Sequence, residues 1–448
     1  MSDKRMLELF EAQAPEWEKR AEEGIEQNRK GNATLLITDK EGKPVPNARV
    51  RVTQTSHAFR FGANLFMLDE LETPEKNATY QQCFASLFNM ATLPFYWDSL
   101  EPQRGAPRYA KDSPKVYRRP APDLCIEFCE KHGIEPREHA LAYEQFFPEW
   151  LGEASVSEVK RELERRYAEI AARYADKIPT IEITNEMGWE KGKTAFYDEP
   201  DYVPYCLALA EKYFPQNILA VNESTDIWMA TCRPTDKYYA YIEANLAKGA
   251  RIDAVGMQYH LFNRREDAYA LTRKTLNPQS LYKYMDLYAR LGKPLQITEV
   301  TVPAYSWEAE DEALQADILE RLYTVWFSHP AVTQIVYWNL VDGYAHLWDP
   351  DPAKIKASQG DMTLGENYYH GGLLRFDLSP KPAYERLKEL IQKRWHTEAT
   401  LTTDSEGKAS FRGFYGAYEI EAIANGKEAK ATLALSAENE NKETVVTV

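Results

Sequence analysis

The sequence has little cysteine and no long apolar run. Its 448 residues include five cysteines, none in a paired C-x-x-C spacing, at Cys83, Cys125, Cys129, Cys206 and Cys232. The odd number and the spacing argue against a complete disulfide framework and against a zinc site. No stretch approaches the roughly 20 apolar residues of a membrane span, and the charged N-terminus lacks the apolar core of a signal peptide. We therefore expect no membrane partner, and either an intracellular protein or a mature secreted form whose signal has been removed.

Basic residues and histidines are also scarce. The formal charge of -15 and the pI of about 5.2 argue against a nucleic-acid partner, because phosphate binding depends on clustered Lys and Arg. An anionic polymer is disfavoured as a substrate for the same reason. With eight histidines, no H-x-H after the first predicted strand and no G-x-S-x-G turn, a metal-dependent hydrolase and a Ser-His-Asp enzyme are both disfavoured. We expect neither a metal nor another cofactor.

The chain instead alternates strand-like and helix-like stretches. The predicted strands are 59–66, 88–93, 134–142, 178–186, 217–222, 252–260, 294–299 and 333–339. The predicted helices are 123–131, 157–174, 204–213, 237–247, 281–291 and 311–328. This pattern favours an α/β fold, a (β/α)8 TIM barrel, over an open doubly wound sheet, which would usually carry a Gly-rich phosphate turn after its first strand.

Two of these strands end in a glutamate. The runs 181–186 and 295–299 are rich in β-branched residues and stop at Glu186 and Glu299. Active sites of such barrels gather at the C-terminal ends of the strands, so both carboxylates are predicted to lie there. The fourth and seventh strands face each other across the barrel, within reach of the about 5–5.5 Å that separates the carboxyl groups of a retaining glycosidase. His260, at the end of the sixth strand, is placed to donate a hydrogen bond to Glu299.

The two ends of the chain have a different pattern. Residues 32–53 alternate apolar and polar positions around a Glu-Gly turn, which predicts a two-stranded hairpin with one buried face. Alternation returns after Trp395, and an isolated hairpin needs such further strands to cover it. We predict a small accessory β-sandwich made from both chain termini, with these boundaries: a helical segment over 1–30, the discontinuous sandwich over 31–58 and 396–448, and the barrel over 59–395.

The sandwich pattern resembles the transthyretin-like or carboxypeptidase-regulatory-like repeat at Thr38-Asp39, Gly42, Pro44-Val45-Pro46, Ala48, Asp404, Gly407, Phe411, Gly416 and Tyr418. Such a sandwich acts as a structural support or as a carbohydrate-binding module. The ten Trp and 28 Tyr of the chain also suit sugar faces, because flat amphipathic rings pack on them.

A series of short motifs runs through the barrel in a fixed order. They are Phe61-Gly62-Ala63, Trp97-Asp98-Ser99-x-Glu101-Pro102-x-x-Gly105, His139-x-Leu141, Asn185-Glu186, Gly256-x-Gln258-x-His260, Ile297-Thr298-Glu299, Ser328-His329-Pro330-Ala331-Val332, Trp338, Gly372-Leu373-Leu374 and Lys381-Pro382-Ala383-Tyr384. In order and spacing this series resembles family 10 of the glycoside hydrolases, the endo-β-1,4-xylanase family. The resemblance runs from about residue 59 to residue 390.

The resemblance implies roles for individual residues. Glu186 would be the acid/base and Glu299 the nucleophile of a double displacement that retains the anomeric configuration. Asn185 would bond the 2-hydroxyl of the sugar, an interaction that strengthens in the transition state. Trp338 and Trp348 would form an apolar floor under the sugar. The other residues expected to contact the substrate are His139, Tyr143, Glu144, Gln258 and His260.

Three positions depart from the family pattern. The polar Glu-Asn-x-x-Lys-Trp of the second strand is replaced by the largely apolar 93–97, the Trp-His after the third strand by Tyr143-Glu144, and the Asn-Asp after the fifth by Asn222-Glu223. A site that loses polar ligands discriminates against its original sugar. As a third carboxylate at the sugar, Glu144 would favour hydroxyl recognition over an acidic sugar.

We therefore expect a retaining β-glycosidase acting on a polysaccharide or its fragments, with β-1,4-xylan as the leading substrate and a carbohydrate as the partner; the sequence predicts no oligomeric state. One alternative is an exo-acting β-glycosidase for a galactoside or another neutral sugar. Another is a carbohydrate-binding protein whose barrel has lost turnover. Replacing Glu186 and Glu299 by Gln distinguishes this binding protein from an enzyme, because the change would leave the function of a binding protein intact.

Overall fold

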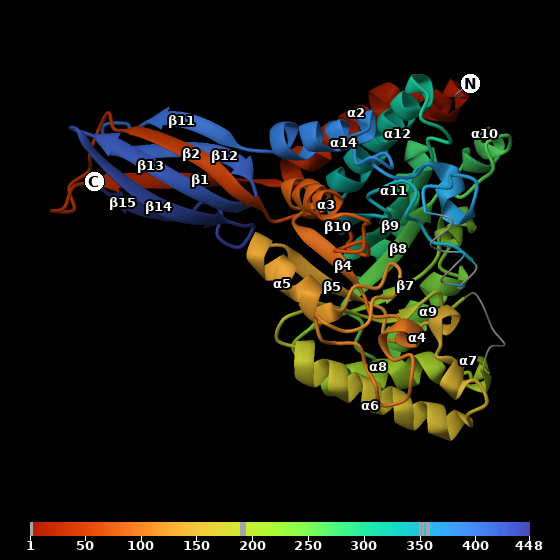
Figure 1. Cartoon of the computed structure of the whole chain (residues 1–448). Helices are drawn as coiled ribbons and strands as arrows, with labels where there is room; N and C mark the ends of the chain where they lie inside the picture. The colour runs from red at the N-terminus through yellow and green to blue at the C-terminus, as the bar shows by residue number, and fades with distance from the viewer. Residues whose placement is uncertain (1–2, 189–193, 349–350, 352–353, 355–358) are drawn as a thin grey trace.

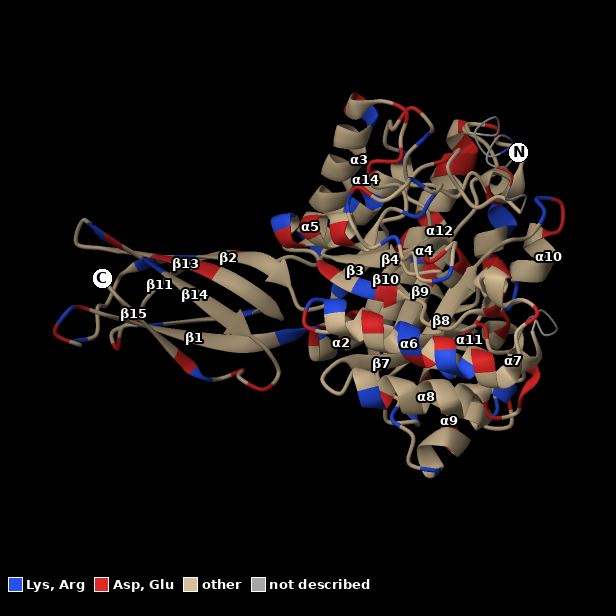
Figure 2. Cartoon of the chain, turned by 60° about the horizontal axis from the view of Figure 1, so that its bottom comes forward, with Lys and Arg blue, Asp and Glu red and all other residues tan. Residues whose placement is uncertain are grey.

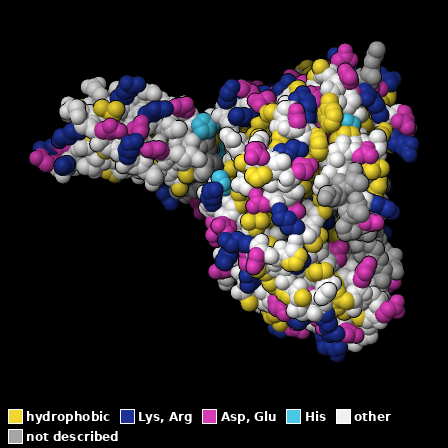
Figure 3. Space-filling model, viewed as in Figure 1, with side chains coloured by type: hydrophobic (Ala, Val, Ile, Leu, Met, Phe, Trp, Pro, Cys, Tyr) yellow, Lys and Arg dark blue, Asp and Glu magenta, His cyan; other side chains and the backbone are white. Residues whose placement is uncertain are grey.

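The structure is a computed structural model that describes residues 3–188, 194–348, 351, 354 and 359–448. It has two lobes (Figure 1): a barrel surrounded by helices, and a smaller β-structure that holds strands from both ends of the chain. In the space-filling view the smaller lobe projects from the larger one, and side chains of both charges are spread over the two lobes (Figure 3).

The larger lobe is a closed barrel of eight parallel strands. Their order is β10-β3-β4-β5-β6-β7-β8-β9, and the pairing of β10 with β3 closes the ring. The predicted (β/α)8 fold and its eight strands are confirmed. The strands are β3 (Arg60–Asn64), β4 (Met90–Pro94), β5 (Glu135–His139), β6 (Thr180–Asn185), β7 (Ile218–Asn222), β8 (Ala254–His260), β9 (Leu295–Thr301) and β10 (Val332–Tyr337).

The barrel strands are buried on both faces, which explains their nearly continuous apolar sequences. Every residue of β6 and of β9 is buried. The charged residues among them pair with each other: Arg137 and Glu182, both fully buried, form an ion pair of 2.5 Å between β5 and β6. Polar side chains that reach solvent are therefore concentrated at the strand ends.

Helices cover the outside of the barrel, and the six predicted ones all form. In α5 the sequence sets both ends, since Pro122 occupies its first turn and Gly133, with φ of 64°, terminates it. Acidic and basic residues are interspersed along α6 (Figure 2). The α-helices of this lobe are α3 (Pro74–Leu87), α4 (Trp97–Leu100), α5 (Pro122–His132), α6 (Val156–Tyr174), α7 (Ala195–Asp198), α8 (Tyr202–Tyr213), α9 (Lys237–Ala247), α10 (Ala268–Thr272), α11 (Pro278–Ala289), α12 (Ala309–Ser328) and α14 (Pro382–Glu389).

Shorter helical turns and an N-terminal helical segment complete this lobe. The short turns are η2 (Glu144–Phe146), η3 (Glu149–Leu151), η4 (Thr225–Met229), η5 (Gly365–Tyr369) and the π-helical η6 (Leu390–Arg394). The N-terminal segment comprises η1 (Lys4–Leu7), α1 (Glu8–Ala12) and α2 (Ala14–Asn28). In Figure 1, α2 runs beside α12 on the outside of the barrel.

The smaller lobe is a sandwich of two sheets, with strand orders β12-β1-β15 and β11-β2-β13-β14. Its buried core is formed by both ends of the chain and includes Leu35, Val50 and Ile420. The predicted sandwich from the two termini is thus present. The strands are β1 (Lys30–Thr38), β2 (Arg49–His57), β11 (Glu398–Thr402), β12 (Lys408–Phe414), β13 (Gly416–Ala424), β14 (Lys427–Leu435) and β15 (Glu443–Thr447).

The predicted hairpin over residues 32–53 is wrong. β1 pairs with β12 and β15, whereas β2 pairs with β11 and β13, so the two strands lie in different sheets. The segment between them contains Pro44 and Pro46. It turns back beside β1 only briefly, through an antiparallel bridge between Thr38 and Pro44, and then crosses to the other sheet. Its alternating pattern correctly indicated one buried face but not the partner strand.

A buried arginine joins the N-terminal segment to the barrel. Arg29 follows α2 and donates three hydrogen bonds to backbone carbonyls, to Phe327 at 2.5 Å, His329 at 2.5 Å and Val332 at 2.7 Å. Beside it, Trp395 stacks on Phe327 with ring centroids 4.3 Å apart. The two ends of the barrel sequence and the start of the sandwich therefore share one packed junction.

All five cysteines are free thiols. Within the described ranges, no helix is both long and apolar enough to cross a membrane. No three or more His, Cys, Asp or Glu side chains in that part of the chain are grouped so that they could hold a metal ion.

Candidate active site

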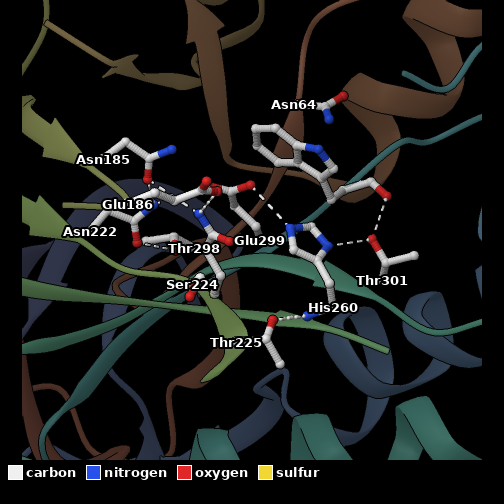
Figure 4. Close-up of polar contacts among 12 residues, drawn as sticks. Asn64, Asn185, Glu186, Asn222, Ser224, Thr225, His260, Thr298, Glu299 and Thr301 are labelled. Carbon is white, nitrogen blue, oxygen red and sulfur yellow. Dashed lines mark hydrogen bonds and ion pairs between the residues drawn. The ribbon is translucent and has the colours of Figure 1, made fainter. Parts of the chain in front are cut away.

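The C-terminal ends of the barrel strands surround a cavity of about 620 Å³. Glu186 and Glu299 both line this cavity. Figure 4 shows their carboxyl groups turned toward each other. The structure therefore brings the two predicted glutamates together at the end of the barrel where active sites of this fold lie.

Glu186 sits directly after β6 in a strained backbone conformation. Its φ of 51° is in the left-handed region, which residues with a Cβ rarely adopt. One carboxyl oxygen accepts a hydrogen bond from the Tyr143 hydroxyl at 2.8 Å, and the other accepts one from Gln258 Nε2 at 2.9 Å. Burial, and next the charge of Glu299, raises the pKa of Glu186 to about 7. This carboxyl group can therefore hold a proton close to neutral pH.

Glu299 lies in β9 and is surrounded by nitrogen donors. Asn222 Nδ2 donates to Glu299 Oε1 at 3.0 Å, and His260 Nε2 lies 3.2 Å from Oε2. The other ring nitrogen of His260 is 2.9 Å from Thr301 Oγ1, which orients the imidazole. The predicted contact between His260 and Glu299 is present. Nitrogen donors from β7 and β8 therefore hold the Glu299 carboxyl group in place.

Three amide side chains connect the two glutamates (Figure 4). Thr298 Oγ1 donates to Asn222 Oδ1 at 2.6 Å, which fixes Asn222 with its NH2 group toward Glu299. Asn185 Oδ1 accepts from Asn222 at 2.9 Å and from Gln258 at 3.2 Å. Asn185 Nδ2 donates to none of the described residues. Because Asn185 lines the cavity, this N–H group is available to a ligand.

The sequence of the barrel matches a known family. A profile of glycosyl hydrolase family 10 matches residues 55–389, well over half of the chain. The chain belongs to glycosyl hydrolase family 10. The fold and the family are thus those of an O-glycoside hydrolase, in agreement with the resemblance found in the short motifs.

Curated relatives extend over most of this chain. The anti-sigma-I factor RsgI6 of Acetivibrio thermocellus is 27% identical over 416 residues, which is 92% of this chain and 47% of that protein. Endo-1,4-beta-xylanase 2 of Arabidopsis thaliana is 24% identical over 408 residues, which is 89% of this chain and 33% of that protein. The chain therefore spans about half or less of the length of these relatives.

Solved structures of the family share the fold. Xylanase 10B from Thermotoga petrophila RKU-1, solved in complex with xylobiose, is 21% identical, with a TM-score of 0.57 over 75% of this chain and 95% of that one. Native xylanase 10B from Thermotoga maritima is 20% identical, with a TM-score of 0.57 over 75% of this chain and 96% of that one. The (β/α)8 barrel described above is the family 10 fold.

Most of the residues predicted to contact substrate line the cavity of this family 10 protein. Tyr143, Asn185, Gln258, His260, Trp338 and Trp348 are all in its wall. Trp338 is 5% exposed and packs edge-on against Phe66, with ring centroids 5.1 Å apart. Trp348 is 70% exposed and stands at the rim. The two tryptophans therefore occupy different depths of the cavity, one as wall and one as edge.

His139 lies behind the cavity wall. It is 1% exposed, and its ring nitrogens lie 2.8 Å from Glu182 and 2.8 Å from the Tyr96 hydroxyl. Its Nε2 is also 4.0 Å from Glu299 Oε1. The structure thus places His139 where it supports Tyr96 and Glu299, and not in the lining where a substrate contact was expected.

Glu144 does not bring a third carboxylate into the cavity. It begins η2, is buried and is absent from the cavity lining. Its charge is among the causes, after burial, that raise the pKa of Tyr197. Tyr143 is extended, so its ring reaches Glu186, and the following helical turn directs Glu144 to the other side. The argument that Glu144 repels an acidic sugar loses its basis.

The sequence analysis assigned no site role to several residues that the structure places in or beside the site, among them Asn222, Glu223, Arg118 and Arg119. Glu223 accepts hydrogen bonds from the backbone of Ser224 at 2.8 Å and Gly188 at 2.9 Å, and its charge contributes to the raised pKa of Glu186. Arg118 and Arg119 line the cavity, although they lie in the loop between α4 and α5. The only sequence signal for them was the adjacent pair of basic residues before Pro120.

Proposed function

We propose that this protein is a retaining β-glycosidase of the endo-1,4-β-xylanase type, with Glu186 as acid/base and Glu299 as nucleophile. The observation that carries the proposal is the contrast between the two carboxyl groups. Glu186 has a pKa raised to about 7 by burial and by the charge of Glu299, whereas Glu299 is held by the side chains of Asn222 and His260. A pair with opposed environments supplies one proton donor and one nucleophile.

In the first step, Glu299 attacks the anomeric carbon while Glu186 transfers its proton to the glycosidic oxygen. The bond between the anomeric carbon and that oxygen breaks, and the aglycone leaves as an alcohol. Transfer of the proton leaves Glu186 ionised, and the hydrogen bonds from Tyr143 and Gln258 then stabilise its charge.

In the second step, ionised Glu186 takes a proton from a water molecule as the water oxygen attacks the anomeric carbon. The ester bond to Glu299 breaks, and Glu299 leaves as a carboxylate. Two inversions give net retention. Asn222 and His260 stabilise the negative charge that returns to Glu299, so the same donors serve the resting enzyme and the leaving group.

The free N–H group of Asn185 supports a further role in sugar binding. Its Oδ1 is held by Asn222 and Gln258, which directs Nδ2 away from the network (Figure 4). A hydrogen bond from this group to the sugar 2-hydroxyl would strengthen as positive charge develops on the ring. Trp338 supplies an apolar wall for the same sugar.

A β-1,4-xylan substrate is supported by the relatives that are named endo-1,4-beta-xylanases and by the solved xylanase that binds xylobiose. The departures at Tyr96 and Tyr143 make the sugar preference a separate question from the chemistry. The exo-acting and non-catalytic alternatives are distinguished from it by product analysis.

The test is hydrolysis of xylan, xylo-oligosaccharides and a panel of aryl β-glycosides, followed by proton NMR of the first product. We expect the β-anomer to appear before mutarotation, and internal cleavage to release mixed oligosaccharides. A 2-fluoro glycoside of a sugar that is turned over should label Glu299, which peptide mass spectrometry identifies. Appearance of the α-anomer, a label on another residue, or binding without turnover in a folded protein would each contradict the proposal.

A further inference from the structure

Arg118 and Arg119 form a buried cationic pair in the cavity wall. They are 3% and 8% exposed, and the described lining contains no other lysine or arginine. A second cavity of about 650 Å³ adjoins the first, and both arginines line it together with Phe146 and His346. The pair therefore stands at the junction of two cavities, and the second cavity is also lined by Glu70, Glu72, Asp98 and Lys115.

The hydrogen bonds of this pair leave donor capacity unused. Arg118 Nη1 donates to Asn339 Oδ1 at 2.5 Å and to the Tyr344 carbonyl at 2.7 Å, whereas its Nε is buried without a partner. Arg119 donates one hydrogen bond, from Nη1 to the Arg118 carbonyl at 2.9 Å, and its guanidinium lies 4.0 Å over the Tyr96 ring. The remaining N–H groups of Arg119, a residue that lines the cavity, have no acceptor among the described residues, and a ligand that supplies one gains a hydrogen bond to a charged donor.

Neither guanidinium has a carboxylate of the described chain within ion-pair distance. The charges of Asp98 and Glu366 act on Arg119 from farther away, and Glu366 already accepts a hydrogen bond from Asn339 Nδ2 at 3.1 Å. Burial lowers the pKa of Arg119 to about 10, so it remains a cation at neutral pH. Burial, and next the charges of Arg118 and Arg119, lowers the pKa of His346 to about 3. The positive potential of the pair thus extends to its neighbour in the wall.

The cationic pair lies on the Glu299 side of the cavity. Arg119 covers the face of Tyr96, the Tyr96 hydroxyl contacts His139 Nε2 at 2.8 Å, and the same nitrogen is 4.0 Å from Glu299 Oε1. A nucleophile sits beneath the anomeric carbon of the sugar that it attacks. The wall on its side therefore faces the glycone, whereas Glu186 faces the leaving group.

We infer that Arg118 and Arg119 recognise a carboxylate on the glycone, so that the substrate is a β-glycoside with a uronic acid unit on that side of the cleaved bond. This inference rests on the proposed glycosidase function and narrows its substrate class. A guanidinium presents a planar fork of N–H donors that matches the two oxygens of a carboxylate. Glu144, the residue expected to exclude such a sugar, is outside the cavity lining.

The test compares 4-nitrophenyl β-D-glucuronide with 4-nitrophenyl β-D-glucoside, which differ by a carboxylate in place of a hydroxymethyl group. We expect kcat/KM of the wild type to be at least about tenfold higher for the glucuronide, the size of effect typical of a hydrogen bond between charged groups. Arg119→Gln should bring this ratio toward one, and Arg119→Lys, which keeps the charge without the fork, should give an intermediate ratio. Arg51→Gln, an equal charge change on an exposed residue of β2, should keep the wild-type ratio.

Binding separates this inference from the function on which it rests. The Glu299→Gln variant is titrated by calorimetry with acidic xylo-oligosaccharides that carry glucuronic acid and with the same compounds after carboxyl reduction. Tighter binding of the acidic form, lost in Glu299→Gln/Arg119→Gln, supports the inference even where neither nitrophenyl glycoside is turned over. Equal binding of both forms overturns it, and so does equal turnover of the two glycosides, while turnover itself leaves the proposed function standing.

Discussion

Asn222 donates a hydrogen bond from Nδ2 to Glu299 Oε1 over 3.0 Å, and the same nitrogen lies 2.9 Å from Asn185 Oδ1. One amide thus orients both the proposed nucleophile and the side chain proposed to hold the sugar. Asn222 is fully buried and is itself fixed by Thr298. The position of the nucleophile is therefore set by residues from β7 and β9 before any substrate arrives.

The proposed roles predict that the two glutamates respond differently to the leaving group. Glu186→Gln should lower kcat/KM by about 10²–10⁴-fold for aryl β-xylobiosides with poor leaving groups, because they need the proton. With a dinitrophenyl leaving group, which departs without protonation, the same variant should lose far less of the rate of the first step. Glu299→Gln should abolish turnover with both, because it removes the nucleophile.

The control is Glu153→Gln, which changes an exposed glutamate outside the cavity lining and should leave the rates unchanged. Steady-state and burst kinetics across a series of leaving groups measure the effect. A Glu186→Gln variant that loses the same factor with every leaving group would argue against an acid role for Glu186.

The pH profile gives a second prediction. Glu186 must be protonated in the first step, so kcat/KM should fall as the pH rises through about 7, the value to which burial and the charge of Glu299 raise its pKa. Tyr143→Phe removes a donor that favours the ionised form, which should move this fall to higher pH. Glu223→Gln removes a negative charge that raises the pKa, which should move the fall to lower pH.

Complete pH profiles of kcat/KM for the wild type and the two variants check these signs. Tyr213→Phe, in α8 and outside the cavity lining, serves as the tyrosine control and should keep the wild-type midpoint. If the midpoints of both variants shift in the same direction, a group other than Glu186 controls the fall in kcat/KM at high pH.

The sequence predicted the barrel and its two glutamates because the signals there are local. A strand buried on both faces, such as β9, must be apolar along its length, and a polar residue at its end then stands out. The pairing of β1 was not predictable in this way. Its partners, β12 and β15, lie more than 350 residues further along the chain, and the two-residue period of a strand identifies its buried face but not its neighbours.

The loop residues of the site were the least predictable. Tyr143 and Glu144 are adjacent, and only the turn that begins at Glu144 decides which of them reaches Glu186. Arg118 has φ of 60° and contacts Asn339, which comes after the last barrel strand. A side chain held by a residue so distant in the sequence leaves no periodic signal, so its place in the cavity required the structure.

The raised pKa of Glu186 also predicts a dependence of stability on pH. Its pKa is about 7 in the folded state and near the ordinary glutamate value of 4.5 in the unfolded chain, so the folded protein binds the extra proton between these values. The stability due to this group is complete below the unfolded pKa and is lost as the pH rises through the folded pKa. Between pH 5 and pH 7 the wild type should lose about 2 kcal/mol that Glu186→Gln does not lose.

Urea unfolding of both proteins across this pH range, followed by tryptophan fluorescence, measures the difference. The comparison uses the change in the free energy of unfolding with pH, so the pH-independent cost of altering the hydrogen bonds from Tyr143 and Gln258 cancels. Glu153→Gln should follow the wild type, because its carboxyl group is exposed. Parallel curves for wild type and Glu186→Gln would show that the buried carboxyl group ionises as readily in the folded protein as in the unfolded one.

The last prediction concerns the junction at Arg29. Arg29→Met keeps an apolar stem but removes this donor from the carbonyls of Phe327 and Val332, whereas the His329 carbonyl still accepts from the Val332 N–H at 3.1 Å. Each buried group left unsatisfied costs about 1–3 kcal/mol, so we expect the free energy of unfolding to fall by at least about 2 kcal/mol. Lys19→Met, on the exposed side of α2, should change it by less than about 0.5 kcal/mol.

Thermal and urea unfolding report the loss, and kcat/KM per folded molecule reports whether the site is touched. Because Arg29 binds carbonyls near the start of β10, and the cavity lies at the opposite ends of the strands, activity at low temperature should be retained in Arg29→Met. An Arg29→Met variant with unchanged stability and reduced kcat/KM would contradict this prediction, because it would show that Arg29 acts on the active site and not on stability.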